Sequence, residues 1–224
     1  MLDKPEMPQG YYDEPRPEVT AHIPEGAKYV IDVGCASGAL GRSIKLKRPG
    51  IEVRGIEVVE EQAARARSFL DDVLVGKAED PLPTDWPRPD CVIFADVLEH
   101  LVDPWAVLKR YREILAPGGT IIASVPNVSN HIVLGGLLRL RWDYDSFGIL
   151  DRTHLRFFTR ETALEMVERA GFSVQHVSRT LEGFACSKFF RALISRENGR
   201  KRIYPRPLAW LFDAYTCQFI IVGR

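Results

Sequence analysis

The sequence predicts an α/β protein built on an open, doubly wound sheet. Apolar stretches typical of buried strands alternate with helical segments over the first 126 residues. Such alternation implies parallel strands joined by right-handed crossovers, with helices covering both faces of the sheet. A glycine-rich turn separates the first strand from the first helix, and sheets of this kind bind ligands at the carboxyl ends of their strands.

The alternating part of the chain contains five expected strands and three expected helices. The strands are expected at residues 28–34, 53–58, 72–76, 90–96 and 120–126. The helices are expected at residues 35–47, 60–70 and 104–119. We therefore expect the residues at the strand ends to meet along one edge of the sheet: Gly34, Glu57, Ala78 and Asp96.

The later part of the chain has a different pattern. Residues 159–172 predict an amphipathic helix with Thr159 as its cap and Gly171 as its stop. Two strand-like stretches follow, at 173–180 and 216–223, and the apolar residues between them predict a helical insertion at 183–213. A Pro-rich lead-in, residues 1–25, precedes the first strand.

Composition excludes several classes of partner. The 30 basic and 30 acidic side chains cancel, so we expect no nucleic-acid partner. A basic run at residues 191–206 is interpreted as a solvated loop, with a phosphate-bearing partner as the alternative. The four cysteines lack metal-finger spacing and fit a reducing compartment. Without a signal peptide or an apolar run of ~18 residues, we expect a cytoplasmic protein with no transmembrane segment.

The glycine turn has the spacing Gly34-x-x-x-Gly38-x-x-Gly41 and follows Asp32. A turn of this kind brings backbone N–H groups and a helix N-terminus to a ligand. It is not the Gly-x-Gly-x-x-Gly turn of dinucleotide enzymes, because Ala36 occupies the second glycine position. It is not a phosphate-binding P-loop either, because no Gly-Lys-Ser/Thr follows.

Four motifs in order resemble those of the Rossmann-like (class I) S-adenosylmethionine (SAM)-dependent methyltransferases. They are VIDVGCASGALG, GIEV, DCVIFADVLEHLVDP and LAPGGTIIASVPN. The stretch THLRFFTRETALEMVERAGF is similar to the segment after the fifth strand in many small-molecule and sugar methyltransferases. The resemblance covers about residues 11–180. It implies one methyltransferase domain over residues 1–224, with a mostly parallel seven-stranded sheet, an antiparallel last strand and a helical lid insertion after the fifth strand.

The resemblance also implies SAM as the cofactor and gives roles to the strand-end residues. Gly34 and Gly38 belong to the cofactor turn, where Gly34 allows close approach of the methionine part. Asp32 is expected to attract the cofactor ammonium, directly or through water. Glu57 is expected to accept hydrogen bonds from both ribose hydroxyls, the alternative being a solvated acid at the strand end.

The adenine corner departs from the family pattern. Where the family often shows Gly-Asp-Ala-Glu-Asp, this chain has GKAED, with Lys77 at the usual acidic position. Adenine recognition is then expected from the Ala78 backbone and from Glu79 or Asp80.

The DVLEH string at the exit of the fourth strand resembles the Glu-x-x-Glu-His of ubiquinone-type O-methyltransferases and of an RNA 3′-end methyltransferase family, in which it binds a divalent metal. Here Asp96 replaces the first glutamate and shortens the reach. We expect no metal, with Asp96 contacting the cofactor and with Glu99 and His100 starting a helix; metal binding is the alternative.

Residues 127–160 form a long connection between the fifth strand and the next helix, and such connections are usually lids or binding segments. Trp142, Tyr144 and Phe147 offer flat surfaces for an acceptor, and Arg152 and Arg156 offer polar contacts. His154, with an ordinary pKa near ~6.5, is the candidate general base.

Two alternatives stay open for this segment. His154 and Arg156 could instead hold the segment closed through hydrogen bonds. The stretch HIVLGGLLRL could form the inner face of a lid or an interfacial patch for a lipid-tailed substrate.

We therefore expect a SAM-dependent methyltransferase acting on a hydroxyl of a small molecule, such as a sugar or glycan precursor. The alternatives are N- or C-methylation, a lipid-tailed quinone-like acceptor, RNA or protein methylation, and a non-catalytic cofactor-binding partner. A homodimer is a candidate assembly.

Overall fold

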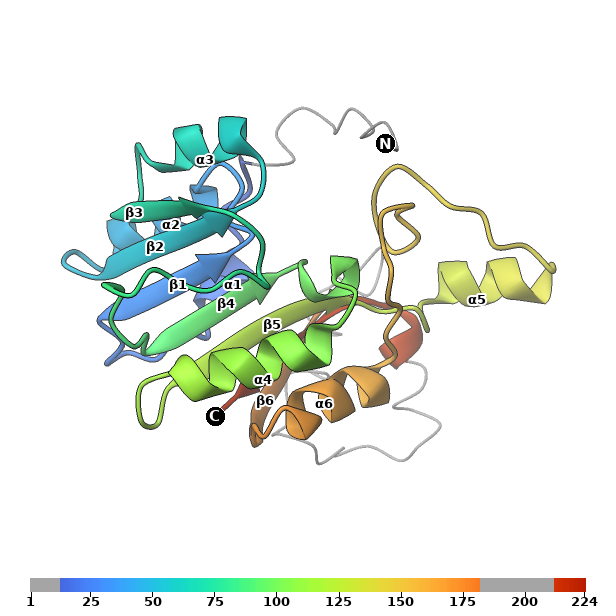
Figure 1. The fold of residues 1–224 in the computed structure, drawn as a ribbon. Coiled ribbons are helices and arrows are strands. Elements are labelled where there is room, and N and C mark those ends of the chain that lie inside the picture. Colours follow the sequence, from blue (N-terminus) through green and yellow to red (C-terminus); the bar gives the residue numbers. More distant parts are fainter. Residues whose placement is uncertain (1–12, 182–211) are drawn as a thin grey trace.

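One mixed sheet forms the centre of the molecule (Figure 1). The computed structural model describes residues 13–181 and 212–224. Its seven strands lie in the order β3-β2-β1-β4-β5-β7-β6. Their bounds are β1 (Tyr29–Val33), β2 (Glu52–Glu57), β3 (Asp72–Val75), β4 (Cys91–Ala95), β5 (Thr120–Pro126), β6 (Val174–Leu181) and β7 (Thr216–Gly223).

The direction of the strands matches the expected topology. Strands β1 to β5 pair in parallel, and β7 runs antiparallel between β5 and β6. The expected seven-stranded, mostly parallel sheet with an antiparallel last strand is confirmed. Because β1 has β2 on one side and β4 on the other, the chain reverses its winding at β1. This switch point is where open sheets bind ligands.

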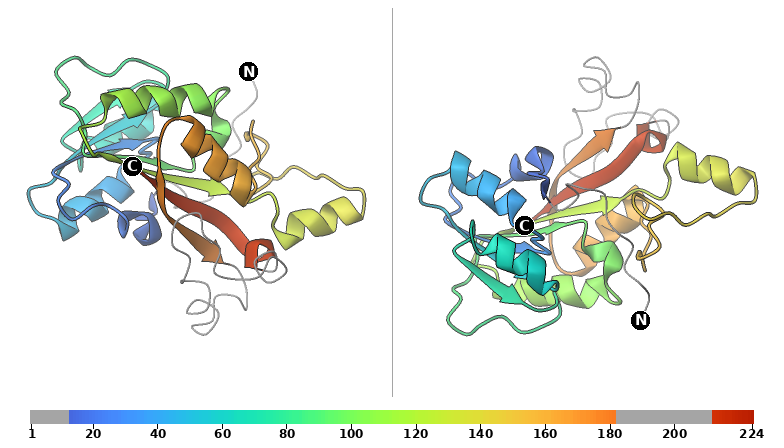
Figure 2. Two further views of the ribbon diagram at one scale, coloured as in Figure 1. Left: turned by 90° about the horizontal axis from the view of Figure 1, so that it is seen from below. Right: turned by 90° about the horizontal axis from the view of Figure 1, so that it is seen from above.

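Helices cover both faces of the sheet, as Figure 2 shows from above and below. One face packs against α1 (Pro17–Thr20), α2 (Ala39–Lys47) and α3 (Glu60–Ala66); the other packs against α4 (Pro104–Ile114) and α6 (Arg160–Arg169). Successive residues of β1 pack on opposite faces of the sheet. Val30 packs on the face covered by α1, α2 and α3, and Ile31 packs on the face covered by α4 and α6. Both layers therefore hold β1, and the turn after it, in one position.

Two helices end earlier than expected, for local reasons. Helix α3 stops at Ala66, where the N–H groups of Ser68 and Phe69 bond to carbonyls three residues back and so form turns. Helix α4 stops at Ile114 because Pro117 disfavours helical backbone at the residue before it. The expected cap Thr159 is confirmed, and it forms a reciprocal capping box with Thr162.

The connection after β5 contains a helix that projects from the body, α5 (His131–Leu138). Its base is held by Asn127 and Asn130, whose side-chain amides donate to the carbonyl of Thr216 at 2.9 and 3.0 Å. The end of the connection is held to its beginning where the N–H of Val128 donates to the carbonyl of Phe158 at 2.8 Å. The 127–160 segment is thus tied down at both ends.

Some expectations concern residues outside the described ranges. Most of the expected helical insertion at 183–213, the whole basic run at 191–206 and the first part of the 1–25 lead-in lie there. Among the described residues, no helix is long and apolar enough to span a membrane.

Candidate active site

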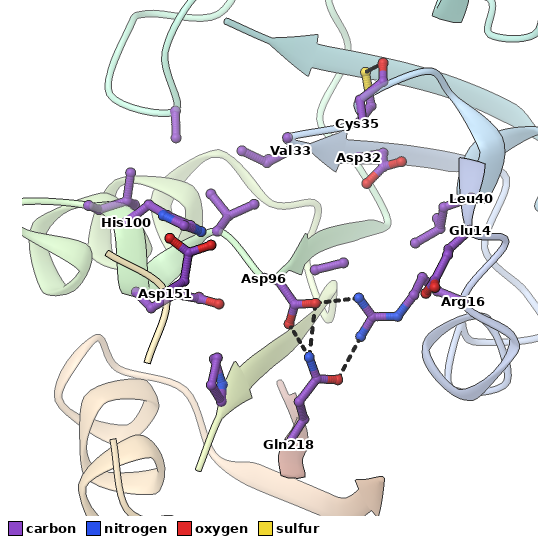
Figure 3. Close-up of a pocket in the computed structure, with 18 of the residues that line it drawn as sticks. Glu14, Arg16, Asp32, Val33, Cys35, Leu40, Asp96, His100, Asp151 and Gln218 are labelled. Atoms are coloured by element: carbon purple, nitrogen blue, oxygen red, sulfur yellow. Dashed lines mark hydrogen bonds and ion pairs between the residues drawn. The ribbon is translucent and has the colours of Figure 1, made fainter. Parts of the chain in front are cut away.

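The carboxyl ends of β1, β2 and β4 open into a cavity of about 1090 Å³ (Figure 3). Its wall is completed by the lead-in at Arg16 and by three neighbouring residues of the 127–160 segment, Phe147, Gly148 and Ile149. The cavity therefore joins the glycine turn at one end to the 127–160 segment at the other.

The glycine turn is shaped by left-handed backbone. Gly34 and Gly38 have φ of 73° and 82°, and Ala36 has φ of 47°, a region that residues with a Cβ adopt at a cost. A Cβ on Gly34 would also lie 2.5 Å from a methyl of Val97. Gly34 and Ala36 line the cavity. Gly38 does not line the cavity. A Cβ at Gly38 would meet Ala66 of α3, so the glycine allows close packing of the helices.

Glu57 ends β2 with its carboxylate fixed on the cavity wall. Oε2 accepts from the backbone N–H of Ala36 at 2.9 Å, and Oε1 accepts from that of Val59 at 2.8 Å. The side chain is buried, yet the residue lines the cavity. Each oxygen keeps a second lone pair, so the carboxylate is positioned to receive two donors from a ligand.

Asp32 lies deep in the same wall. Its side chain is buried, and Oδ2 has no hydrogen-bond partner. Burial, and then the Glu57 carboxylate, raise the pKa of Asp32 to about 7, although Arg16 acts in the opposite direction. A cationic ligand group beside Asp32 would stabilise its ionised form.

The turn after β3 presents Ala78 and Glu79 to the cavity. The guanidinium of Arg110 in α4 holds this turn by donating to the carbonyls of Ala78, Glu79 and Asp80. The Asp80 carboxylate accepts from the backbone N–H of Lys77 at 2.7 Å, so it shapes the turn. Asp80 does not line the cavity.

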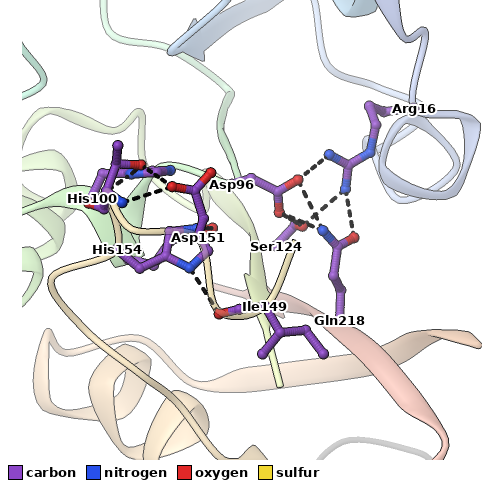
Figure 4. Close-up of polar contacts among 10 residues, drawn as sticks. Arg16, Asp96, His100, Ser124, Ile149, Asp151, His154 and Gln218 are labelled. Atoms are coloured by element: carbon purple, nitrogen blue, oxygen red, sulfur yellow. Dashed lines mark hydrogen bonds and ion pairs between the residues drawn. The ribbon is translucent and has the colours of Figure 1, made fainter. Parts of the chain in front are cut away.

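Asp96 is the centre of a hydrogen-bonded network at the cavity floor (Figure 4). Its carboxylate accepts from Arg16, from the Ser124 hydroxyl at 2.6 Å and from the Gln218 amide at 3.0 Å. Arg16 also donates to Ser124 and Gln218, at 3.1 and 3.0 Å. The network joins the lead-in to β5 and β7, and it turns Asp96 toward Arg16.

A cluster of Glu99, His100 and His154 lies beside this network. The 3-10 helix η2 (Leu98–His100) carries the first two residues, and the 127–160 segment carries His154. Each residue offers one ligand atom, and these atoms lie within 4.8 Å of one another. Glu99 and His100 do lie in a short helix, as expected, and the fold also brings their side chains together with His154.

Glu99 is the least satisfied polar group of the cluster. Its side chain is 1% exposed, and within residues 13–181 and 212–224 neither carboxylate oxygen has a hydrogen-bond partner. Burial, and then the Asp96 carboxylate, raise its pKa well above the ordinary value. A buried carboxylate of this kind needs a proton or a cation.

Both imidazoles have Nδ1 beside a backbone carbonyl. Nδ1 of His154 faces the carbonyl of Ile149 at 3.0 Å, and Nδ1 of His100 faces the carbonyl of Thr153 at 3.3 Å. With these nitrogens donating, Nε2 of each ring keeps its lone pair. Nε2 of His154 lies 4.0 Å from Glu99 Oε1. Burial, and then His100, lower the pKa of His154, so the ring is neutral near pH 7.

This donor set fits a divalent metal. One carboxylate and two imidazole nitrogens are ligands that Zn²⁺, Mn²⁺ and Fe²⁺ accept, and the carbonyls behind each ring supply the supporting hydrogen bonds such ligands usually have. Asp96 is not part of this set, since Arg16, Ser124 and Gln218 already engage its carboxylate.

Four of the residues expected to contact the acceptor lie elsewhere. Trp142 and Tyr144 pack with Phe157 in a ring cluster, with centroids 5.2 and 6.5 Å from the Phe157 ring. Arg156 donates to the carbonyl of Val102, and Arg152 reaches the backbone of Asp145 at 3.4 Å. None of these four residues lines the cavity. Their aromatic and charged chemistry instead supports the 127–160 segment.

Several site residues were not foreseen from the sequence. Ile149 lines the cavity beside His154, and Arg16 and Gln218 complete the network around Asp96. Gln218 carries a recognisable signal, because it is a polar residue within the apolar strand TCQFIIVG. Arg16 stands in a polar, Pro-rich stretch that gives no such signal.

The fold and the site define a class of protein, and comparison with known proteins agrees. A family model described as a methyltransferase domain matches residues 10–177. The chain belongs to this family, and it is a SAM-dependent methyltransferase.

Individual relatives add detail. A ubiquinone biosynthesis O-methyltransferase of Cereibacter sphaeroides (strain ATCC 17025 / ATH 2.4.3) is 28% identical over 175 residues, covering 72% of this chain and 70% of the relative. A SAM-dependent methyltransferase of Thermotoga maritima, described as a possible histamine N-methyltransferase, superposes with a TM-score of 0.62 at 22% identity, covering 92% and 84% of the two chains. The plantazolicin methyltransferase, solved with S-adenosylhomocysteine (SAH), gives 0.57 at 15%, covering 88% and 76%.

Proposed function

We propose that the chain transfers the methyl group of SAM to a hydroxyl of a small-molecule acceptor. The observation that carries the proposal is the continuity of the cavity, which runs from Glu57 to His154 past Asp96. Cofactor and acceptor can therefore meet inside one cavity, which allows the alignment that in-line methyl transfer requires.

The cofactor end offers a partner for each polar part of SAM. Glu57 receives the two ribose hydroxyls, and the backbone at Ala78 lies where adenine is expected. Asp32 faces the ammonium group, whose positive charge relieves the cost of ionising this buried acid. Arg16 is the cation nearest to Asp96 in this wall, and it supplies a counter-charge for the methionine carboxylate.

The acceptor end supplies a proton acceptor. The acceptor oxygen forms its bond to the methyl carbon while the carbon–sulfur bond breaks and leaves its electron pair on sulfur. The hydroxyl proton goes to Nε2 of His154, which is free because Nδ1 is engaged with Ile149. Because the pKa of His154 is lowered, the ring is already neutral and can take this proton at pH 7.

A metal at Glu99, His100 and His154 is the second candidate, favoured by the two unpartnered oxygens of Glu99. When bound, a divalent cation lowers the pKa of a coordinated hydroxyl. His154 would then be a ligand, because one Nε2 lone pair cannot serve both roles. Its neighbours would position the acceptor oxygen and exclude water.

The relatives support a hydroxyl acceptor, since the one described above is named as an O-methyltransferase of ubiquinone biosynthesis. Phe147 and Ile149 give the acceptor end an apolar wall, which suits a phenolic ring better than a sugar. We therefore place a phenol or catechol ahead of a sugar as the acceptor class.

Calorimetry with SAH and product analysis together test the proposal. Purified protein is expected to bind SAH and to form a methyl ether from a simple catechol, detected by mass spectrometry. His154→Ala is expected to lower kcat at least about 10²-fold, the lower range for a general base, with SAH affinity retained. Full turnover in His154→Ala would remove the residue from the chemistry, and absence of SAH binding would end the proposal.

Titration with Mn²⁺ or Zn²⁺ alone separates the two candidates. The base candidate predicts no saturable binding and activity that survives chelators. The metal candidate predicts binding that Glu99→Gln abolishes and that Glu52→Gln, at the start of β2, leaves intact.

A further inference from the structure

Helix α5 is an apolar element that few of the described residues cover. Of its eight residues, only Val133 is buried, and none carries an acidic, lysine or arginine side chain. Ile132 is 61% exposed and Leu138 is 87% exposed. A helix that is apolar on all sides is normally buried in protein or lipid, whereas α5 projects from the body in Figures 1 and 2.

The residue at the tip of this projection is doubly unfavourable in water. Leu140 is 96% exposed, and it adopts φ of 58°, a left-handed conformation that leucine rarely takes. The conformation ends the helix and points its last leucines outward. A surface that removes Leu138 and Leu140 from water would offset both costs.

The sequence after the tip has the composition of a membrane interface. Arg139 and Arg141 flank Leu140, and the stretch from residue 127 to residue 142 contains no acid. Trp142 and Tyr144 follow, with Asp143 between them; Asp143 pairs with Arg141 at 2.7 Å on the exposed surface, and Tyr144 is 54% exposed. Arginines beside exposed leucines, with aromatic rings behind them, match the layers of an anionic lipid surface from acyl chain to headgroup.

The exposed apolar residues are spread around α5. At 100° per residue, Ile132, Leu137 and Leu138 point in three different directions. A protein partner, including a second copy of this chain, requires one self-consistent face. A fluid lipid phase does not require one such face.

We propose that α5 and the tip at residues 138–142 insert into the surface of a lipid bilayer that contains anionic headgroups. The 127–160 segment also contributes Phe147 and Ile149 to the cavity wall, so the inserted element and the acceptor end belong to one stretch of chain. Docking therefore sets this end of the cavity against the membrane, where an acceptor with an apolar tail is dissolved.

Vesicle flotation with the full chain tests the proposal. The probes are vesicles of phosphatidylcholine alone and vesicles of phosphatidylcholine with phosphatidylglycerol. The variant is Leu138→Ser/Leu140→Asn, because asparagine tolerates the left-handed conformation better than leucine. The matched control is Leu46→Ser, since Leu46 is 73% exposed on α2, on another part of the surface.

The wild type and Leu46→Ser are expected to float with the mixed vesicles. The double variant is expected to bind at least about 10²-fold more weakly, a tenfold loss for each leucine withdrawn from the lipid. Arg139→Gln/Arg141→Gln is expected to weaken binding to the anionic vesicles alone, by about fivefold for each charge at low salt. Each variant should bind SAH as the wild type does, because the altered side chains lie outside the cavity.

Three results would overturn the proposal. One is absence of wild-type binding to either kind of vesicle. Another is equal binding by the wild type and the double variant. The third is a wild-type dimer in light scattering that the double variant converts to monomer, because a second copy of the chain would then cover α5. None of these results bears on methyl transfer to a water-soluble acceptor, so the proposed function is judged separately.

Discussion

Replacing Glu57 with glutamine tests the cofactor end of the site with almost no change in shape. The Glu57 carboxylate accepts one backbone hydrogen bond on each oxygen, from Ala36 and Val59. A glutamine keeps one oxygen but places an NH₂ group opposite the other N–H. It also removes the negative charge that would meet the ribose hydroxyls.

The expected loss of affinity follows from the two ribose hydrogen bonds. A hydrogen bond to a charged acceptor contributes about 1.5–3 kcal/mol, against about 0.5–1.5 kcal/mol for a neutral pair. Losing about 1 kcal/mol at each of two bonds weakens SAH binding about 30-fold. The NH₂ group facing a backbone donor adds to the loss, so 30-fold is the lower end.

Isothermal titration of SAH into Glu57→Gln and wild-type protein measures this difference. The matched control is Glu52→Gln, because Glu52 lies at the other end of the same strand and pairs with Arg54. The control should bind SAH with wild-type affinity. A Glu57→Gln protein that is folded and binds SAH within about threefold of wild type would refute the ribose assignment.

Three further predictions concern neighbouring residues. The pKa of Asp32 is raised to about 7, so its protonated form stabilises the apo protein at acidic pH, and this contribution is lost as pH rises from about 4 to 7. Relative to wild type, Asp32→Asn should therefore gain up to about 4 kcal/mol of unfolding free energy across that window in urea titrations. A pH-independent difference between the two proteins would contradict the assignment. Ala36→Gly should raise the unfolding free energy by up to about 1 kcal/mol, because glycine adopts the φ of 47° without strain; a lower melting temperature in calorimetry would count against it. Arg16→Gln should weaken SAH binding more than about tenfold in titrations, whereas wild-type affinity would show that Arg16 only supports Asp96.

The sheet was predictable from sequence because each of its strands leaves a local signal. Strands buried on both faces read as continuous apolar runs, as in TIIASVP and TCQFIIVG. The turn between β1 and α2 needs glycine at Gly34, where φ is 73°, and this requirement is visible in one stretch of residues. The family motifs then fixed the order of these elements along the sheet.

The rest of the site was harder to predict because its contacts cross the whole chain. Arg16 bonds to residues 80, 108 and 202 positions further along, and no local pattern encodes such contacts. Trp142 and Tyr144 have the chemistry of a binding surface, yet they pack against Phe157. Composition gives the kind of side chain in a long connection but not the direction in which it points.

Glu99 also shows what the sequence alone does not predict. Its place three residues after Asp96 is typical of a helix start, and the resemblance offered a metal ligand as the alternative. Only the fold shows that both carboxylate oxygens are buried without partners, within reach of His100 and His154. That observation is why the proposed function places the acceptor beside this cluster.

A crystal structure with bound SAH tests the central claim most directly. We expect the ribose hydroxyls on Glu57, the amino group beside Asp32, and the sulfur directed toward the space next to Glu99 and His154. A sulfur directed away from that space, or SAH bound outside the cavity, would contradict the account.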